Sequence, residues 1–180
     1  LGKGQTIPIN DTAVGAMPSE SADLAVLRDK DGKFASQIRL LATRIVEQQS
    51  NLGYTSYVVT SAAGGEGKTM TAANLALVMS EDSDRRVALV DATFRHPRAA
   101  ELFNLDRRRG LRSVIEGEHE LSACVARVLG RNLIVLPAGG SHDNPASILS
   151  SPRFKSLIGE LSETVDFMFV DAPAAIPHAD

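Results

Sequence analysis

The sequence is poor in several features that would point to particular classes of protein. It has one cysteine, Cys124, in 180 residues, which excludes an internal disulfide and favours a reducing compartment such as the cytoplasm. Aromatic residues make up only 4% of the chain, so no stacking platform for single-stranded nucleic acid is expected. The formal charge of -3 gives no general reason to expect nucleic acid or an anionic membrane as a partner.

Long apolar runs and clusters of metal ligands are also missing. No apolar stretch approaches the length needed to cross a bilayer, and the N-terminus lacks the charged-then-apolar pattern of a signal peptide, so we expect a soluble chain. The histidines show no metal-ligand spacing. They are His96, His119, His142 and His178. Cys124, with Val125 and Val128 on the same expected helix, is predicted to be a core residue and not a nucleophile.

The hydrophobic content of 43% and the length of 180 residues are enough for one domain with one substantial core. Residues 1–32 are rich in Gly, Ser, Asp and Pro, and we predict that they form a flexible N-terminal linker or tail. Residues 33–180 are predicted to form the ordered domain. Its first element is an amphipathic helix, with apolar residues at helical spacing from Phe34 to Ile45, ended by Gly53.

Four short apolar runs predict buried parallel strands at residues 56–60, 87–90, 133–136 and 167–170. Helical patterns alternate with these strands. One predicted helix follows the loop that ends at Thr69. The others cover residues 97–102, 110–117, 121–129, 145–149 and 152–161. This alternation predicts an α/β fold with a parallel β-sheet and helices on both faces.

The segment from Thr55 to Met79, TSYVVTSAAGGEGKTMTAANLALVM, has the pattern of a phosphate-binding P-loop. Small residues let successive backbone N–H groups surround an anion, the following helix adds its positive end, Lys68 can reach the β- and γ-phosphates, and Thr69 can ligate Mg²⁺. The spacing is met except that Ala62 stands where the first glycine usually does. The alternative is a glycine-rich turn that only joins strand to helix. The residues predicted to bind nucleotide are Ala63, Gly64, Gly65, Glu66, Gly67, Lys68, Thr69 and Met70.

Two aspartates follow strand ends that should lie beside this loop, because ligands of such sheets lie outside the carboxyl ends of the strands. Asp171 follows four apolar residues and has the form of a Walker B acid, which would hold Mg²⁺ together with Thr69. Asp91 ends the preceding parallel strand. It is predicted to belong to the metal shell or to accept a proton from an attacking hydroxyl. The alternative for Asp171 is a cap on the following turn.

Residues 85–112 hold eight arginines against three acidic residues, a local excess of +5. This surface could dock an acidic or phosphorylated segment, or neutralise charge near a γ-phosphate. For Arg107 to Arg109 a solvated face is the favoured interpretation. Arg95 is the arginine that we assign to the catalytic edge, since it lies four residues beyond Asp91.

Together these segments resemble the cytoplasmic domain of bacterial tyrosine autokinases of the capsular and exopolysaccharide type. That family is a branch of the P-loop ATPases that also includes chromosome-partition and division-site ATPases. The resemblance lies in VVTSAAGGEGKTMTAANLA (Walker A), VALVDATFRHPR (Walker A′) and FMFVDAP (Walker B), with support from GLRSVIEG, NLIVLPAGG and NPASILSSPRFKSLIGEL. It covers about residues 34–175.

The resemblance implies a P-loop NTPase fold, binding of ATP or ADP with Mg²⁺, and transfer of the γ-phosphate to tyrosines in the tail of a neighbouring subunit. Lys68 would contact the phosphates, Thr69 and Asp171 the metal, and Asp91 would be base or metal-shell acid. It also implies a membrane partner that governs polysaccharide chain length and export, and a location at the inner face of the cell membrane through that partner or a fused segment.

The chain departs from the family pattern at several positions. Thr93 replaces the second acid of Walker A′, which would weaken phosphotransfer. The helix that carries the family's ring-assembly motif, Glu-x-x-Arg-x-x-Arg, has Ser36, Arg39 and Ala42 at the three motif positions. A homo-oligomer is therefore still an alternative, but ring formation is not expected. Tyr54 and Tyr57 flank a strand predicted to be buried, and we expect both to be poor phosphate acceptors.

The sequence is therefore compatible with three functions. The first is an ATP-dependent protein tyrosine kinase of capsular or exopolysaccharide synthesis and export. The second is an ATP-binding regulatory partner of that export without tyrosine transfer, which Thr93 favours. The third is a partition-type ATPase; Ala63, where partition relatives carry a second loop lysine, argues against it.

Overall fold

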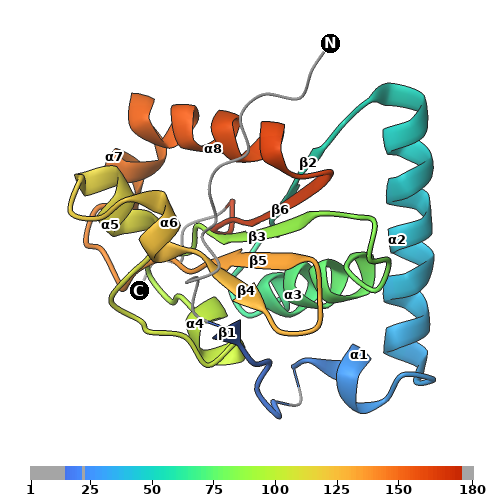
Figure 1. The fold of residues 1–180 in the computed structure, drawn as a ribbon. Helices are drawn as coiled ribbons and strands as arrows, with labels where there is room; N and C mark the ends of the chain where they lie inside the picture. The colour runs from blue at the N-terminus through green and yellow to red at the C-terminus, as the bar shows by residue number, and fades with distance from the viewer. Residues whose placement is uncertain (1–14, 22, 176–180) are drawn as a thin grey trace.

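The computed structural model describes residues 15–21 and 23–175, which form a six-stranded sheet with helices on both faces (Figure 1). The strands are β1 (Gly15–Ala16), β2 (Ser56–Val59), β3 (Val87–Asp91), β4 (Ala126–Val128), β5 (Leu133–Leu136) and β6 (Phe167–Asp171). The helices are α1 (Ala25–Arg28), α2 (Lys33–Leu52), α3 (Lys68–Met79), α4 (Ala99–Leu102), α5 (Leu111–Glu116), α6 (Leu121–Cys124), α7 (Pro145–Leu149) and α8 (Pro152–Thr164). The predicted α/β fold is confirmed.

The strands lie in the order β1-β4-β5-β3-β6-β2, and each pair of neighbours is parallel except β4 and β5. The central strand β3 therefore has β5 on one side and β6 on the other. In this register Asp91 lies opposite Asp171, and Asp171 lies opposite Val59 at the end of β2. Pairing alone thus brings three strand ends together at one edge.

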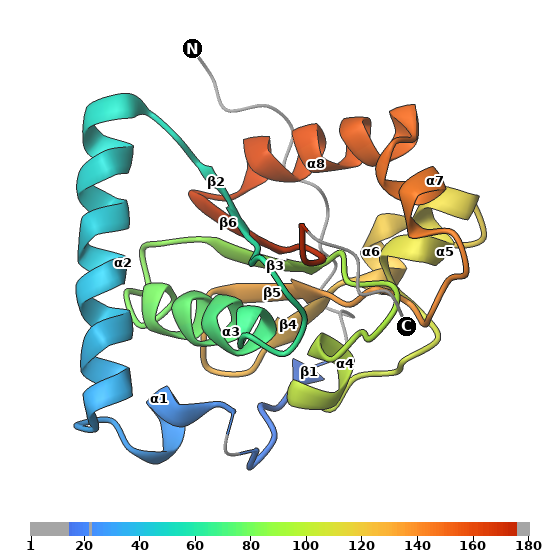
Figure 2. The same ribbon diagram turned by 180° about the vertical axis from the view of Figure 1, so that it is seen from behind.

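Alternate residues of the central strands serve two separate cores, as the period of two along a strand requires. Val87, Leu89 and Phe169 belong to the core under α2 and α3, whereas Val90 and Met168 belong to the core under α5 and α8. Figures 1 and 2 show α2 and α3 on one face of the sheet and α8 on the other. Burial on both faces explains why these strands read as continuous apolar runs.

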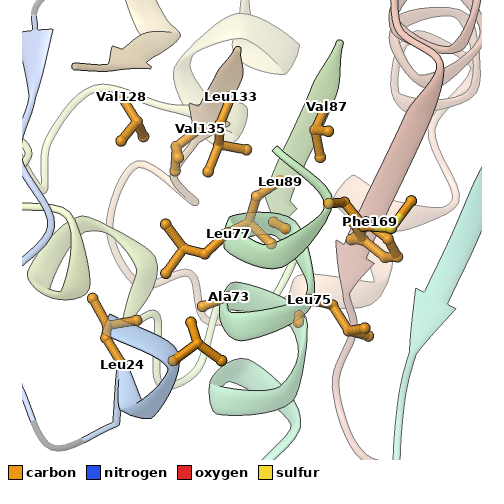
Figure 3. Packing of buried hydrophobic residues seen from close by; sticks show 14 of the residues in the cluster. Leu24, Ala73, Leu75, Leu77, Val87, Leu89, Val128, Leu133, Val135 and Phe169 are labelled. Carbon is orange, nitrogen blue, oxygen red and sulfur yellow. The ribbon is translucent and has the colours of Figure 1, made fainter. Parts of the chain in front are cut away.

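Helix α3 lies inside the first core, between the sheet and α2. Figure 3 shows Leu77 beside Leu89 of the sheet, and Ala73 and Leu75 belong to the same core. Buried residues occur all round the helix, so it has no polar stripe. The helix that begins at the P-loop is thereby fixed by packing along most of its length.

The N-terminal segment differs from its prediction. Residues 1–14 of the expected tail lie outside the described residues. From Gly15 onward, however, the chain packs on the domain: β1 pairs with β4, and Ala16, Leu24 and Val26 are buried. Its short apolar patch belongs to the same core as α3, and the side-chain oxygen of Asn74 on that helix accepts the Val26 N–H at 3.0 Å. Part of the segment predicted as a tail therefore has regular structure and packs on the domain.

Two further predictions are corrected. The helix expected over residues 121–129 ends at Cys124, and β4 replaces its second half, because the backbone there pairs with β5 on one side and with β1 on the other. Cys124 is buried, as predicted. Strand β2 was expected to be buried, but it lies at the edge of the sheet, and Val58 is 64% exposed. On α2, Ala42 is buried and Leu41 is 39% exposed, the reverse of the simple apolar pattern.

Among the residues that the structure describes, no helix combines the length and the apolar character that a membrane span requires.

Close backbone packing after β5 depends on one glycine. A Cβ on Gly110 would lie 2.1 Å from the carbonyl oxygen of Pro137 and 2.4 Å from the nitrogen of Gly139. The Leu111 N–H donates to the same carbonyl at 2.7 Å, so the two loops cannot separate freely. The loop that follows β5 is therefore held against α5 by backbone contacts.

We predict that Gly110→Ala destabilises the fold by about 1–3 kcal/mol, because the added methyl group forces backbone apart. The melting temperature should fall by about 2–10 °C for a domain of this size. Gly159→Ala is the matched control: Gly159 lies in α8 with no atom near its Cβ position, so alanine should stabilise by about 0.5–1 kcal/mol. Thermal unfolding followed by circular dichroism measures both, and equal melting temperatures for Gly110→Ala and the parent would contradict the packing argument.

Candidate active site

The predicted nucleotide loop lies where the topology places ligands, beyond the carboxyl end of β2. It connects Val59 to Lys68, the first residue of α3. The Ala172 N–H donates to the Val59 carbonyl at 3.0 Å, which ties the end of β6 to the start of the loop. The loop therefore faces the ends of β6 and β3.

The loop has the backbone conformation of an anion-binding turn. Gly65 and Gly67 have positive φ angles of 75° and 83°, which side-chain-bearing residues rarely adopt. Gly67 precedes α3, and its carbonyl accepts the first helical hydrogen bond, from Thr71. The first N–H groups of α3, which have no acceptor within the helix, thus lie at the loop, where they favour negative charge.

The loop already holds one negative charge. A carboxylate oxygen of Glu66 accepts the Ala63 N–H at 3.0 Å. This bond, together with the Ser61 hydroxyl, the Ala62 N–H and the charge of Lys68, holds the pKa of Glu66 below its usual range despite opposing desolvation. The local field therefore favours an anion at this position.

Thr69 and Asp171 are in direct contact. The Thr69 hydroxyl donates to Asp171 Oδ2 at 2.5 Å. Burial raises the pKa of Asp171 to about 7; the charge of Asp91 acts in the same direction, while the Thr69 hydrogen bond and Lys68 oppose it. Among the described residues, Asp171 Oδ1 is a buried side-chain oxygen without a hydrogen-bond partner.

Asp91 lies beside Asp171 but is engaged elsewhere. Its Oδ1 accepts the Thr93 N–H at 2.9 Å and the Thr93 hydroxyl at 2.6 Å. Its Oδ2 accepts the backbone N–H groups of Arg98 and Ala99 at 3.2 and 3.0 Å, which caps α4. Burial raises the pKa of Asp91, and these four hydrogen bonds oppose the rise. A role as base or metal ligand requires at least one of them to break.

The predicted arginine lies on the surface of the loop after β3. Arg95 is exposed, and within the described part of the chain no ion pair or hydrogen bond joins its side chain to the nucleotide loop. Several other arginines of the basic segment pair with nearby acids: Arg98 with Asp23, Arg107 with Glu101. The structure thus brings Lys68, Thr69, Asp171 and Asp91 to one edge and leaves Arg95 at its periphery.

The residues present fit a magnesium ion held jointly with a nucleotide. In residues 15–21 and 23–175, no group of three or more His, Cys, Asp and Glu side chains could hold a metal alone. Mg²⁺ is usually held by one or two carboxylates, waters and the substrate phosphates. Thr69 and the unpartnered oxygen of Asp171 are the groups that would complete such a shell.

One residue that shapes the site was missed in the sequence. Asn74 is fully buried on α3; its amide nitrogen donates to the carbonyls of Met70 and Asp23, and its oxygen accepts the Val26 N–H. It links the first turn of the nucleotide helix to the N-terminal segment. The signal was present, since it is a lone amide in an Ala- and Leu-rich helix.

A family model described as ParA, the NUBPL iron-transfer P-loop NTPase, matches residues 54–176. The chain is 34% identical over 146 residues to the tyrosine-protein kinase YwqD of Bacillus subtilis strain 168, covering 81% of this chain and 61% of that protein. It is 26% identical over 174 residues to the tyrosine-protein kinase ptk of Acinetobacter johnsonii, covering 96% of this chain and 24% of that protein. The chain therefore spans less than two thirds of either relative.

A solved structure of the VpsO kinase domain is also similar, with a TM-score of 0.68 and 27% identity, covering 83% of this chain and 76% of that one. The resemblance to bacterial tyrosine kinases drawn from the three motifs is confirmed by these relatives. With the glycine-rich loop, the strand-end aspartate beside it and a mostly parallel sheet all present, the match to the family model shows that the chain belongs to the ParA family of P-loop NTPases, and it is similar to bacterial tyrosine-protein kinases.

Proposed function

We propose that this chain is the nucleotide-binding domain of a protein tyrosine kinase that acts in capsular or exopolysaccharide synthesis and export. The observation that carries the proposal is the contact between Thr69 and Asp171, with one Asp171 oxygen left without a partner beside the loop. The names of the relatives supply the reaction: YwqD and ptk are called tyrosine-protein kinases, and a relative from Rhizobium meliloti is called the succinoglycan biosynthesis transport protein ExoP.

In this proposal ATP is the phosphate donor and lies along the loop from Ala63 to Met70. Lys68 and the N–H groups at the start of α3 hold the β- and γ-phosphates. Thr69 and Asp171 hold Mg²⁺, which would neutralise charge on the phosphates when bound. Arg95 would approach the γ-phosphate from the loop after β3. A membrane protein that governs polysaccharide chain length is the proposed partner, which would place the domain at the inner face of the membrane.

A second function, an ATP-binding regulator without phosphotransfer, is favoured by the state of Asp91. All four hydrogen bonds to its carboxylate come from the loop after β3 and the start of α4. Thr93 supplies two of them from the position where the kinases carry a second acid. With no acid at Thr93 and Asp91 engaged, the site could bind Mg²⁺ and nucleotide but lack a group that accepts the proton of the attacking hydroxyl.

The kinase proposal is tested by incubating the protein with Mg²⁺, labelled ATP and a synthetic Glu/Tyr polymer. We expect phosphotyrosine on the polymer, and we expect Lys68→Met to lower its rate of formation by about a hundredfold or more, as removal of one key charge-stabilising donor does. Phosphotyrosine is measured by acid hydrolysis and mass spectrometry. ATP binding by calorimetry with no transfer to the polymer would instead support the regulator.

Asp171 gives the nucleotide-free protein a defined pH dependence. Its folded pKa of about 7 lies above the ordinary value of 3.8, so between these values the folded state holds a proton that the unfolded state has lost. Through this group, stability falls as pH rises from about 4 to about 7 and then levels off. Asp171→Asn keeps an oxygen for Thr69 but cannot ionise, so it should gain melting temperature relative to the parent across this window.

Binding of Mg²⁺ with ADP should reverse the order of the melting temperatures of the parent and Asp171→Asn. The ionised carboxylate is the form that ligates Mg²⁺, so near pH 8 the nucleotide and metal should raise the melting temperature of the parent more than that of Asp171→Asn. Glu118→Gln, at an exposed acid outside both the nucleotide loop and the proposed metal shell, is the control. Identical pH profiles for the parent and Asp171→Asn would show that Asp171 does not titrate in this range.

Thr93→Asp separates the two functions. In the nucleotide-free protein we expect this variant to be less stable, because a second carboxylate would face Asp91 in a nearly buried position. If the missing acid limits phosphotransfer, the same variant should raise kcat on the Glu/Tyr polymer more than it changes nucleotide affinity. Thr93→Ser, which keeps the hydroxyl bond to Asp91, should leave both quantities close to those of the parent; an unchanged kcat in Thr93→Asp would contradict the assignment.

A further inference from the structure

The chain has two tyrosines, and the structure treats them differently. The hydroxyl of Tyr57 lies 3.3 Å from the carbonyl oxygen of Ile45 and 3.1 Å from that of Tyr54. Its ring stacks on Phe169 with centroids 5.9 Å apart, and burial raises its pKa. Tyr57 is thus held between α2 and the sheet, and its hydroxyl would have to leave this position before it could react.

Tyr54 is the opposite case. It is 58% exposed, and the described residues offer its hydroxyl no recorded hydrogen bond. Gly53, in the left-handed conformation, ends α2 just before it, so Tyr54 stands where the chain turns from helix to edge strand. The expectation that Tyr54 would be shielded by a buried strand is wrong, because β2 lies at the edge of the sheet.

The surroundings of Tyr54 suit contact with another protein surface. Leu52 and Val58, on either side of it in the chain, are 58% and 64% exposed. No charged residue occurs between Glu47 and Glu66, so this segment would not be repelled by a triphosphate. Exposed apolar side chains beside an exposed tyrosine are a common feature of interaction sites.

Tyr54 cannot approach the nucleotide loop of its own chain. It precedes the amino end of β2, whereas the loop follows the carboxyl end, and the strand between them spans about 13 Å at the usual rise per residue. Figures 1 and 2 show the connection between α2 and β2 at one end of the strand and the connection to α3 at the other. Any transfer to Tyr54 therefore has to come from another molecule.

We propose that Tyr54 is a phosphate acceptor of this chain, modified in trans by ATP bound at the P-loop of a second copy. This inference rests on the proposed kinase function and names one of its acceptors. The Tyr54 oxygen forms a bond to the γ-phosphorus while the bond from that phosphorus to the ADP oxygen breaks. ADP leaves with the bonding electrons, and the phenolic proton passes to solvent. Because Tyr54 is exposed, its phosphate remains hydrated after transfer.

The test uses two full-length variants with separate roles. The donor is Tyr54→Phe, which keeps the nucleotide site but lacks the acceptor. The acceptor is Lys68→Met, labelled with ¹⁵N, which keeps Tyr54 but lacks the phosphate-binding lysine. They are mixed with Mg²⁺ and ATP, and phosphorylated peptides of the ¹⁵N chain are sequenced by mass spectrometry. The Glu/Tyr polymer is incubated with the same donor in parallel.

We expect phosphate on Tyr54 of the ¹⁵N chain, at a rate that rises with donor concentration. Phosphate on the ¹⁵N chain should persist when the acceptor also carries Tyr57→Phe and disappear when it carries Tyr54→Phe. Phosphorylation of the polymer without label on Tyr54 would overturn this inference and leave the proposed function standing. No transfer to either would overturn both, and labelling of the parent chain at a rate independent of dilution would overturn transfer in trans.

Discussion

The parallel pairing of β2, β6 and β3 is the constraint on which the rest of the site depends. It sets Val59, Asp171 and Asp91 in one row at the edge of the sheet. Two carboxylates in adjacent positions, both removed from water, cannot ionise independently, and this is part of why the pKa of Asp171 rises to about 7. Ionisation of both aspartates is therefore unfavourable in this site, and a bound divalent cation would offset their repulsion.

The two acids resolve this conflict in different ways. Asp91 is surrounded by donors from its own loop, which satisfy its charge and fix the start of α4. Asp171 receives one hydroxyl and keeps an oxygen without a partner. An unsatisfied buried oxygen is unfavourable unless another group binds there. This asymmetry favours a structural role for Asp91 and supports the proposed metal-binding role of Asp171, although the sequence presents both as strand-end aspartates.

Features encoded by local pattern could be predicted from the sequence, and features set by distant contacts could not. The buried strands β3, β5 and β6, the long helices and the nucleotide loop follow from apolar periodicity and from glycines where the chain must turn. The edge position of β2 depends on strand order, which no local pattern encodes. The same holds for residues 15–32: a two-residue strand has no period, and its docking depends on an amide, Asn74, 48 positions from Val26. Two of the four hydrogen bonds to Asp91 come from the backbone of Arg98 and Ala99 at the start of α4, and they depend on how that helix packs.

Asn74 joins the N-terminal segment to α3 by hydrogen bonds. Its amide binds the carbonyl of Met70, one residue beyond Thr69, and also the backbone at Asp23 and Val26. Asp23 in turn pairs with Arg98, whose backbone N–H donates to Asp91. A displacement of the N-terminal segment would thus reach both the first turn of α3 and the loop after β3. A buried polar group that loses its partner is costly in free energy, so breaking one of these contacts would destabilise the others. We therefore expect the contacts to form and break together.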